Sequence, residues 1–198
     1  MSEITPRPAR RRRRADAERS AAAVLDAALT VLTQRPEASV EDVAAASGVS
    51  RQTVYAHFPS RDALLHAVVD RITAETVAVL DAARLDEGRA TEALLRFLDA
   101  GWRTFERYPL LQGLPVVDAE TDRARHEPVL ARLLALVRRG QRSGEFDADP
   151  APEWLLTATV ALGHAAGEQV GAGRMTADAA LAELRRSVLR VFGARKSG

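Results

Sequence analysis

The 198-residue chain is 46% hydrophobic but only 5% aromatic, and alanine, leucine and arginine dominate it, a composition that favours packed helices over strands. Its formal net charge of +1 shows that the molecule as a whole is no polycation, yet residues 1–20 hold seven arginines against three acidic residues. The chain has no cysteine, which excludes disulfides, thiolate zinc sites and cysteine nucleophiles and fits a reducing, cytoplasmic location.

The arginine-rich N-terminus predicts a disordered basic arm over residues 1–15. A first helix then follows from Asp16 to Gln34, because apolar residues recur at helical spacing until Pro36 ends the segment. Ser39 is placed as the N-cap of a short second helix that ends near Ser47. A tight turn at residue 48 leads directly into a third helix.

The remaining helices follow from the same signals of start, stop and periodicity. Ser60 caps a fourth helix that runs to about Arg84, and a fifth helix ends at Tyr108. A short, irregular helix is expected over 110–119, and an amphipathic helix begins at Pro128 and ends before Gly144. Helices over about 152–170 and 176–192 complete an all-α fold of about nine helices.

The second and third helices, joined by a glycine-containing turn, have the layout of a helix-turn-helix, whose last helix enters the DNA major groove. Arg51 and Gln52 lie in the first turn of that helix, and these residue types pair with guanine and adenine respectively. Thr53, Tyr55 and His57 suit contacts to phosphate and sugar. The predicted DNA-binding residues are Arg13, Arg14, Ser39, Val40, Ser50, Arg51, Gln52, Thr53, Tyr55, His57, Ser60 and Arg61.

Each of these residues also has an ordinary structural interpretation. Ser50 and Ser60 can be helix caps alone, Tyr55 can pack on its own domain, and Arg51 can be solvated. The ordered set, together with the turn and the basic arm, favours DNA recognition. The helix-turn-helix DNA-binding domain is therefore predicted over residues 16–62, and an effector-binding and dimerisation domain over residues 63–198.

The stretch "SVEDVAAASGVSRQTVYAHFPSRDALLHAVVDR" resembles the DNA-binding signature of TetR-type transcriptional regulators. The resemblance covers Asp16 to about Ile72 and includes the turn glycine, Tyr55, Phe58 and the leucine pair that follows. It implies a homodimeric, all-helical protein with an effector-binding core. Arg61 departs from the pattern, because the family usually has lysine there, although either cation can bind phosphate.

Large aromatic residues of the C-terminal part are candidates for an effector pocket between facing helices, although aromatics at helical spacing also form ordinary cores. His126 and His164 are either polar anchors in such a cavity or ordinary histidines. His164 precedes Glu168 by four residues but has no further ligand at evident spacing, so we predict no metal. The candidate ligand-binding residues are Phe97, Trp102, Phe105, Tyr108, Leu133 and Trp154.

The last two predicted helices carry small or apolar faces that permit close packing of helices. Such faces fit either the core of one chain or a two-fold interface. The family resemblance favours the interface. The candidate dimer-interface residues are Ala158, Ala161, Leu162, Ala165, Leu181, Leu184, Val188 and Val191.

Several other functions are disfavoured by the sequence. It contains no nucleophile elbow and no HExxH motif, so we predict neither an enzyme nor a cofactor. Acidic residues interrupt the only segment that resembles a signal peptide, and the most apolar stretch is too short to span a bilayer. The function predicted is a ligand-responsive repressor that binds a palindromic operator as a homodimer and is released by a small apolar or aromatic molecule. A DNA-binding architectural protein without an effector is the alternative.

Overall fold

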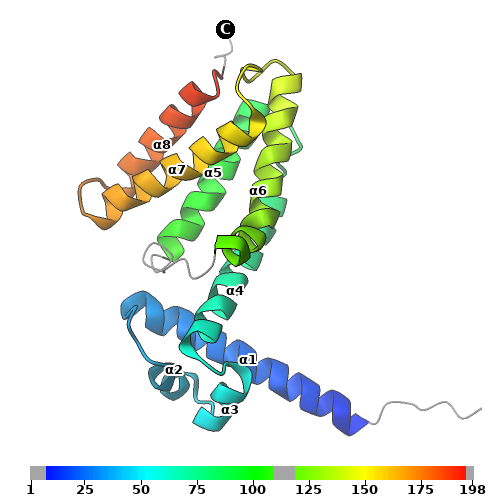
Figure 1. Ribbon diagram of the computed structural model, residues 1–198, viewed down its shortest axis with the longest axis vertical. Helices are drawn as coiled ribbons and strands as arrows, with labels where there is room; N and C mark the ends of the chain where they lie inside the picture. Colours follow the sequence, from blue (N-terminus) through cyan, green and yellow to red (C-terminus); the bar gives the residue numbers. More distant parts are fainter. Residues whose placement is uncertain (1–7, 109–118, 195–198) are drawn as a thin grey trace, which may run out of the picture. The chain divides into compact units, whose positions relative to one another are not determined.

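The computed structural model describes residues 8–108 and 119–194. Within these ranges the chain forms eight helices and no strand. Figure 1 labels the helices in chain order. The expected short helix over 110–119 lies outside the described residues, apart from Ala119, which begins the sixth helix. The helices are α1 (Pro8–Gln34), α2 (Val40–Ser47), α3 (Arg51–His57), α4 (Arg61–Ala82), α5 (Ala90–Arg107), α6 (Ala119–Arg142), α7 (Pro152–Gly171) and α8 (Ala177–Val191).

The chain divides into two compact units, Met1–Arg71 and Ile72–Gly198, and the division falls inside α4. The boundary expected from the sequence was 62/63. In the N-terminal unit, α1, α2 and α3 pack against one another. Their apolar side chains, with those of the first half of α4, form the core of this unit: Val24, Ala28, Leu32, Val43, Val54, Phe58, Leu64, Leu65 and Val68.

The first helix begins at Pro8, so the expectation of a disordered arm up to residue 15 is wrong for residues 8–15. Proline is favoured in the first turn of a helix, and alanine and arginine are good helix formers. Glu18 accepts a hydrogen bond from Arg14 at 3.2 Å, and Asp16 pairs with Arg19. These pairs, three or four residues apart, offset part of the repulsion among the arginines.

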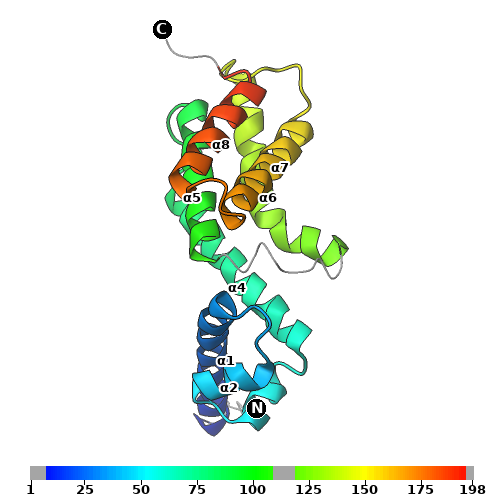
Figure 2. The same ribbon diagram turned by 90° about the vertical axis from the view of Figure 1, so that its left-hand side faces the viewer.

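In the C-terminal unit, α5, α6, α7 and α8 form a ring of successive contacts, in which α5 packs on α6, α6 on α7, α7 on α8 and α8 on α5. Figure 2 shows these helices as a four-helix bundle. Its core includes Leu94, Phe97, Leu133, Leu155 and Phe192, together with Leu80 from the end of α4. The C-terminal half of the chain is therefore a helical bundle, as expected.

The sequence-based start of α6 at Pro128 is wrong, because the helix begins at Ala119 and Pro128 lies inside it. A proline within a helix lacks the amide that would bond the carbonyl four residues earlier, so its usual place is the first turn. That preference led to the misplacement. Figure 2 shows α6 changing direction in its first half, as an internal proline produces.

Gly167 of α7 permits a close approach to Phe105 of α5. A Cβ atom at residue 167 would lie 2.1 Å from Phe105 Cζ, whereas one at Gly163 would meet nothing within 4 Å. We therefore expect Gly167→Ala to lower the free energy of unfolding by about 1–3 kcal/mol through overpacking. Gly163→Ala, in the same helix, is the matched control and should gain up to about 1 kcal/mol from helix propensity. Equal urea midpoints for both variants would contradict this packing.

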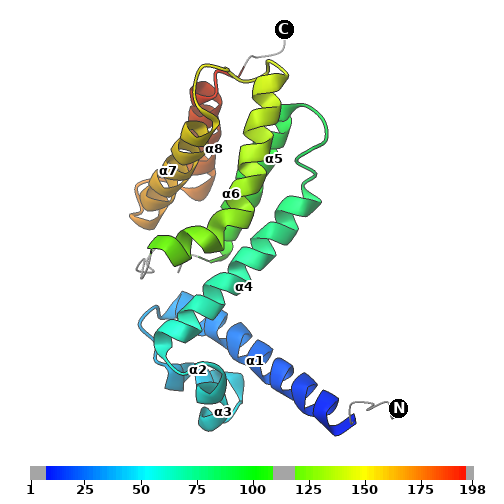
Figure 3. The same ribbon diagram turned by 45° about the vertical axis from the view of Figure 1, so that its right-hand side comes forward.

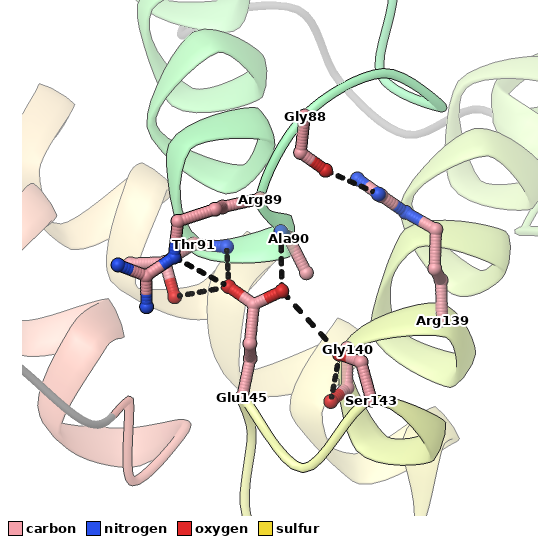
Figure 4. Close-up of polar contacts among 8 residues, drawn as sticks. All are labelled: Gly88, Arg89, Ala90, Thr91, Arg139, Gly140, Ser143 and Glu145. Atoms are coloured by element: carbon pink, nitrogen blue, oxygen red, sulfur yellow. Dashed lines mark hydrogen bonds and ion pairs between the residues drawn. The ribbon is translucent and has the colours of Figure 1, made fainter. Parts of the chain in front are cut away.

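The loop between α6 and α7 caps the start of α5 through Glu145 (Figure 4). The residue at the N-cap position of α5, Arg89, makes no capping hydrogen bond with its side chain. Glu145 instead accepts hydrogen bonds from the backbone amides of Ala90 and Thr91, at 3.0 and 3.2 Å, and from the Thr91 hydroxyl at 3.3 Å. The Ala90 amide, above all, lowers the pKa of Glu145 below its ordinary value. A residue 55 positions away from Ala90 thus accepts hydrogen bonds from backbone amides in the first turn of α5, which have no partner within the helix.

Because the pKa of Glu145 is lowered in the folded state, its contribution to stability is present above the ordinary glutamate pKa and is lost as the pH falls through the lowered value. At neutral pH, Glu145→Gln should lower the free energy of unfolding by about 1–2 kcal/mol, the usual effect of losing a cap. Urea unfolding at neutral and acidic pH measures this, and the difference from wild type should shrink in acid. The matched control is Glu127→Gln, on the exposed side of α6; an equal loss in both would contradict the capping role.

Candidate DNA-binding surface and effector region

The candidate recognition helix α3 is positioned by local sequence signals. Gly48 adopts φ +68° just after α2, a backbone conformation that glycine takes without strain. The Ser50 hydroxyl accepts a hydrogen bond from the Thr53 amide at 3.2 Å and lies 2.8 Å from the Thr53 hydroxyl. Val54 is fully buried. This arrangement leaves Arg51, Gln52 and Tyr55 exposed to solvent.

The second helix begins with a reciprocal cap that uses the polar groups of Ser39. The Ser39 hydroxyl accepts from the Asp42 amide at 3.1 Å, and the Asp42 carboxylate accepts from the Ser39 amide at 2.9 Å. The side chain of Val40 is buried in the core of the unit. Val40 can therefore meet a phosphate only through its backbone amide, which lies in the first turn of α2 where the helix dipole favours anions.

A carboxylate that the sequence did not single out lies beside the exposed face of α3. Glu41, in the first turn of α2, forms an ion pair with Arg51 and accepts a hydrogen bond from the Tyr55 hydroxyl at 2.8 Å. The Arg51 guanidinium lies 6.0 Å from the centre of the Tyr55 ring. The Tyr55 hydroxyl, above all, and the Arg51 charge lower the pKa of Glu41, so this carboxylate is ionised at neutral pH.

Arg61 is engaged within the N-terminal unit. Its guanidinium donates to the backbone carbonyls of Pro36 and Ala38, at 2.5 and 3.3 Å. These contacts tie the start of α4 to the turn between α1 and α2. The neighbouring Ser60 hydroxyl caps α4 by accepting from the Ala63 amide at 3.1 Å. Arg61 thus has a structural role within the unit. To bind a phosphate as well, its guanidinium would have to use its other donors or give up these hydrogen bonds.

The remaining DNA-binding candidates differ in their exposure. Arg13 and Arg14 are exposed on α1, beyond the part of that helix that is buried in the domain. His57 and Thr53 are half-buried, and the His57 ring lies 6.1 Å from that of Phe58. The basic cluster and the start of α3 therefore provide the most accessible cations of this set.

Most of the candidate effector residues lie inside the C-terminal unit. Phe97, Trp102 and Leu133 belong to its core, and Phe105 packs against that core. The rings of Trp102 and Phe105 stack with centroids 5.0 Å apart. Tyr108 is buried, and its hydroxyl donates to Glu75 at 2.6 Å. Aromatic faces and a carboxylate therefore occur together in this region.

Trp154 is an exception, and its proposed place in an interior pocket of the chain is wrong. Its side chain is 63% exposed at the start of α7, whereas the next residue, Leu155, is buried. Neighbouring residues of a helix point about 100° apart, so both members of this apolar pair cannot face the same core. The exposed tryptophan belongs to the outer face of α7.

Two hollows stand out on the described surface, and neither is lined by the predicted effector residues. The first, about 300 Å³, has an apolar floor that includes Leu80 and Leu136 and a charged rim that includes Asp81, Arg132 and Arg139. Arg132 donates to both oxygens of Asp81, at 2.7 and 3.0 Å. Since Arg132 and Asp81 of the rim already pair with each other, this hollow is a weaker effector candidate than the aromatic region.

The candidate dimer-interface residues fall into three groups. Ala161, Ala165 and Val191 are exposed, and Ala158, Leu162 and Leu181 are half-buried. Leu184 and Val188 are buried in the core of their own unit. The expectation that these two residues meet a second chain is therefore wrong, because α8 turns them toward the bundle. Figure 3 shows α7 and α8 lying side by side.

Metal-ligand groups and membrane-spanning helices are both absent from the part of the chain that the structure describes. Among residues 8–108 and 119–194, no group of three or more histidine, cysteine or acidic side chains could hold a metal ion. No helix in the same ranges is both long and apolar enough to cross a membrane.

Comparison with known proteins supports the helix-turn-helix assignment. Residues 24–68 match the profile of bacterial regulatory proteins of the tetR family. The transcriptional repressor LfrR of Mycolicibacterium smegmatis is 37% identical over 83 residues, which are 42% of this chain and 44% of that repressor. The transcriptional repressor Rv3405c of Mycobacterium tuberculosis is 33% identical over 172 residues, which cover 85% of this chain and 80% of the relative.

Solved structures share the fold over most of their length. LfrR in complex with proflavine superposes with a TM-score of 0.67 at 24% identity, covering 91% of this chain and 98% of LfrR. The transcriptional regulator FadR of Bacillus subtilis, in complex with stearoyl-CoA, has a TM-score of 0.72 at 16% identity, and the match covers 86% of this chain and 96% of FadR. These structures share the all-helical fold. The long match to the M. tuberculosis repressor, with the match to the tetR profile, shows that the chain belongs to the TetR family and is a DNA-binding transcriptional regulator of the helix-turn-helix type.

Proposed function

We propose that this regulator is a ligand-responsive repressor that binds a palindromic operator as a homodimer and is released by a small apolar or aromatic molecule. The observation that carries the DNA-binding part is the exposed face of α3. Arg51 and Gln52 lie exposed in its first turn, and the buried Val54 anchors the helix in the core. A helix held in this way can present both side chains to base edges in the major groove. Such a protein acts in the cytoplasm, where its DNA is, and without catalysis.

The homodimer is supported by an apolar face on α7 that its own chain leaves uncovered. Trp154, Ala161 and Ala165 are exposed along this helix and lie on one face of it, because they are seven and four residues apart. An exposed tryptophan next to small apolar residues is typical of the centre of a protein interface. The proposed interface therefore includes Trp154 in addition to six of the residues predicted from the sequence, and it excludes Leu184 and Val188. The six are Ala158, Ala161, Leu162, Ala165, Leu181 and Val191.

The effector is supported by the aromatic region of the C-terminal unit. LfrR is known in complex with proflavine and FadR with stearoyl-CoA, so proteins of this fold accept aromatic or long apolar ligands. Here the stacked Trp102 and Phe105 rings offer apolar faces. Glu75 and Glu106 accept hydrogen bonds from Tyr108 and Trp102 and add negative charge. A planar aromatic molecule, neutral or cationic, suits this combination.

The operator part is tested by selection from randomised DNA duplexes with the full-length protein. We expect one enriched motif with dyad symmetry, whose half-sites lie about one helical turn or a multiple apart. An Arg51→Ala, Gln52→Ala double variant should remain folded and lose the enrichment. A wild-type motif without dyad symmetry would contradict the homodimer, and retention of a motif that no compound releases would favour an architectural protein without an effector.

A further inference from the structure

The exposed surface of the helix-turn-helix contains a carboxylate at a place where DNA phosphates are expected. Glu41 belongs to α2, yet two residues one turn apart on α3 converge on it: Arg51 by an ion pair and Tyr55 by a hydrogen bond of 2.8 Å. Both donors use the same carboxylate oxygen, Oε1. A negative charge on a DNA-binding face weakens binding to any duplex, so its placement between these two side chains calls for a function.

We propose that Glu41 is a specificity-determining positioning residue, which holds Arg51 over the Tyr55 ring so that the guanidinium reads a base edge instead of binding any nearby phosphate. This role rests on the proposed operator binding through α3. Glu41 itself touches no base in this proposal. It acts through Arg51.

The donor geometry of arginine allows this role. A guanidinium has five N–H donors, and Glu41 engages Nη2 of Arg51. Arg51 also interacts with the Tyr55 side chain, and its remaining donors can form the paired hydrogen bonds that arginine makes with guanine O6 and N7. A restrained arginine also loses less rotamer freedom when it binds a base than an unrestrained one does. Glu41 thereby favours the base contact that needs one fixed orientation.

The same carboxylate disfavours binding to DNA of arbitrary sequence. A non-specific complex consists almost entirely of phosphate contacts, which a neighbouring negative charge weakens. At the operator, the oriented Arg51–base contact outweighs that repulsion. Specificity is the difference between the two binding free energies. Glu41 therefore raises specificity in two ways, by favouring the base contact at the operator and by weakening binding to other DNA.

The pair has little effect on the folded chain itself. The side chains of Arg51 and Glu41 are 67% and 39% exposed, and ion pairs this exposed to water contribute little to stability. When DNA covers the pair and excludes water, its electrostatic interaction becomes stronger. The effect of Glu41 should therefore be visible in DNA binding and not in unfolding.

The test compares the full-length wild type with Glu41→Gln, which removes the charge, and Glu41→Asp, which keeps the charge but shortens the reach. Each protein is titrated with the duplex that the wild type selects and with a random-sequence duplex. Both variants should reduce the ratio of the two affinities by at least about fivefold, the lower limit of what one bidentate arginine contact contributes. Glu41→Gln should also bind random DNA more tightly. Glu37→Gln, an exposed carboxylate of the same unit, is the matched control and should leave the ratio unchanged.

Action through Arg51 is tested by repeating Glu41→Gln in an Arg51→Ala background, where the ratio should no longer respond to it. The inference is overturned if Glu41→Gln changes both affinities by one common factor, if Glu41→Asp behaves as wild type, or if the effect persists without Arg51. If the wild type itself selects no sequence, the proposed function fails, and the role of Glu41 fails with it. If the wild type selects a motif and the variants select it equally well, only the role of Glu41 is refuted.

Discussion

Raising the salt concentration from about 50 mM to about 200 mM should weaken operator binding about 10³- to 10⁵-fold, if the dimer neutralises about 6 to 10 phosphates. The net charge of the chain is only +1, so this dependence must come from local cations. The first turns of α1 provide them, because Arg12, Arg13 and Arg14 are all exposed. Fluorescence anisotropy of a labelled operator across a salt series measures the slope.

The origin of the salt dependence can be located by substitution. An Arg13→Gln, Arg14→Gln variant should reduce the slope of log affinity against log salt by about 1 for each phosphate that the variant no longer binds. It should do so for operator and random DNA alike, because binding to phosphates carries no sequence information. Arg103→Gln, an exposed position on α5, is the matched control. A wild-type slope near zero would rule out phosphate binding altogether.

Local chemistry explains why much of the N-terminal unit could be predicted from the sequence. The cap at Ser39, the left-handed turn at Gly48 and the cap at Ser50 each depend on residues within three positions of one another. Such short-range preferences act before any tertiary contact forms. The bounds of α2 and α3 follow from them, and so does the exposure of Arg51 and Gln52.

The contacts of Glu41 could not be predicted in this way. Glu41 lies 10 residues from Arg51 and 14 from Tyr55, and the meeting of these side chains depends on the angle at which α2 and α3 pack. The capping of α5 by Glu145 spans 55 residues and depends on the bundle as a whole. In both cases the residue type is ordinary and only the tertiary fold gives it a partner.

The apolar helices of the C-terminal unit show a different limit. Sequence periodicity identifies α7, but the run Trp154, Leu155, Leu156 offers several possible buried faces. The structure buries Leu155 and exposes Trp154, since Leu155, Thr159 and Gly167 form the face turned to the bundle. The same ambiguity placed Leu184 and Val188 in an interface when they fill the core of their own unit. Periodicity locates a helix more reliably than it assigns the partner of each face.

An effector that fits the aromatic region should loosen operator binding about 5- to 150-fold, which corresponds to a coupling of about 1–3 kcal/mol. The helix α4 belongs to both units: Arg61 at its start donates to carbonyls of the N-terminal unit, and Leu80 near its end lies in the core of the bundle. A ligand that shifts the end of α4 can therefore alter how the DNA-binding unit is held. By reciprocity, operator DNA must weaken effector binding by the same factor.

Calorimetric titration with planar aromatic compounds, beginning with proflavine, measures both sides of this coupling when it is done with and without operator. Phe105→Leu should weaken effector binding, because it removes the half-buried ring that stacks on Trp102 while keeping an apolar side chain in its place. Trp154→Leu, an aromatic on the outer face of α7, is the matched control and should leave effector affinity unchanged once the protein is confirmed to be dimeric. If DNA leaves the affinity for a releasing compound unchanged, release does not occur through this coupling. If Trp154→Leu lowers the affinity for the effector and Phe105→Leu does not, the effector binds at the outer face of α7. The aromatic region then serves only as part of the hydrophobic core.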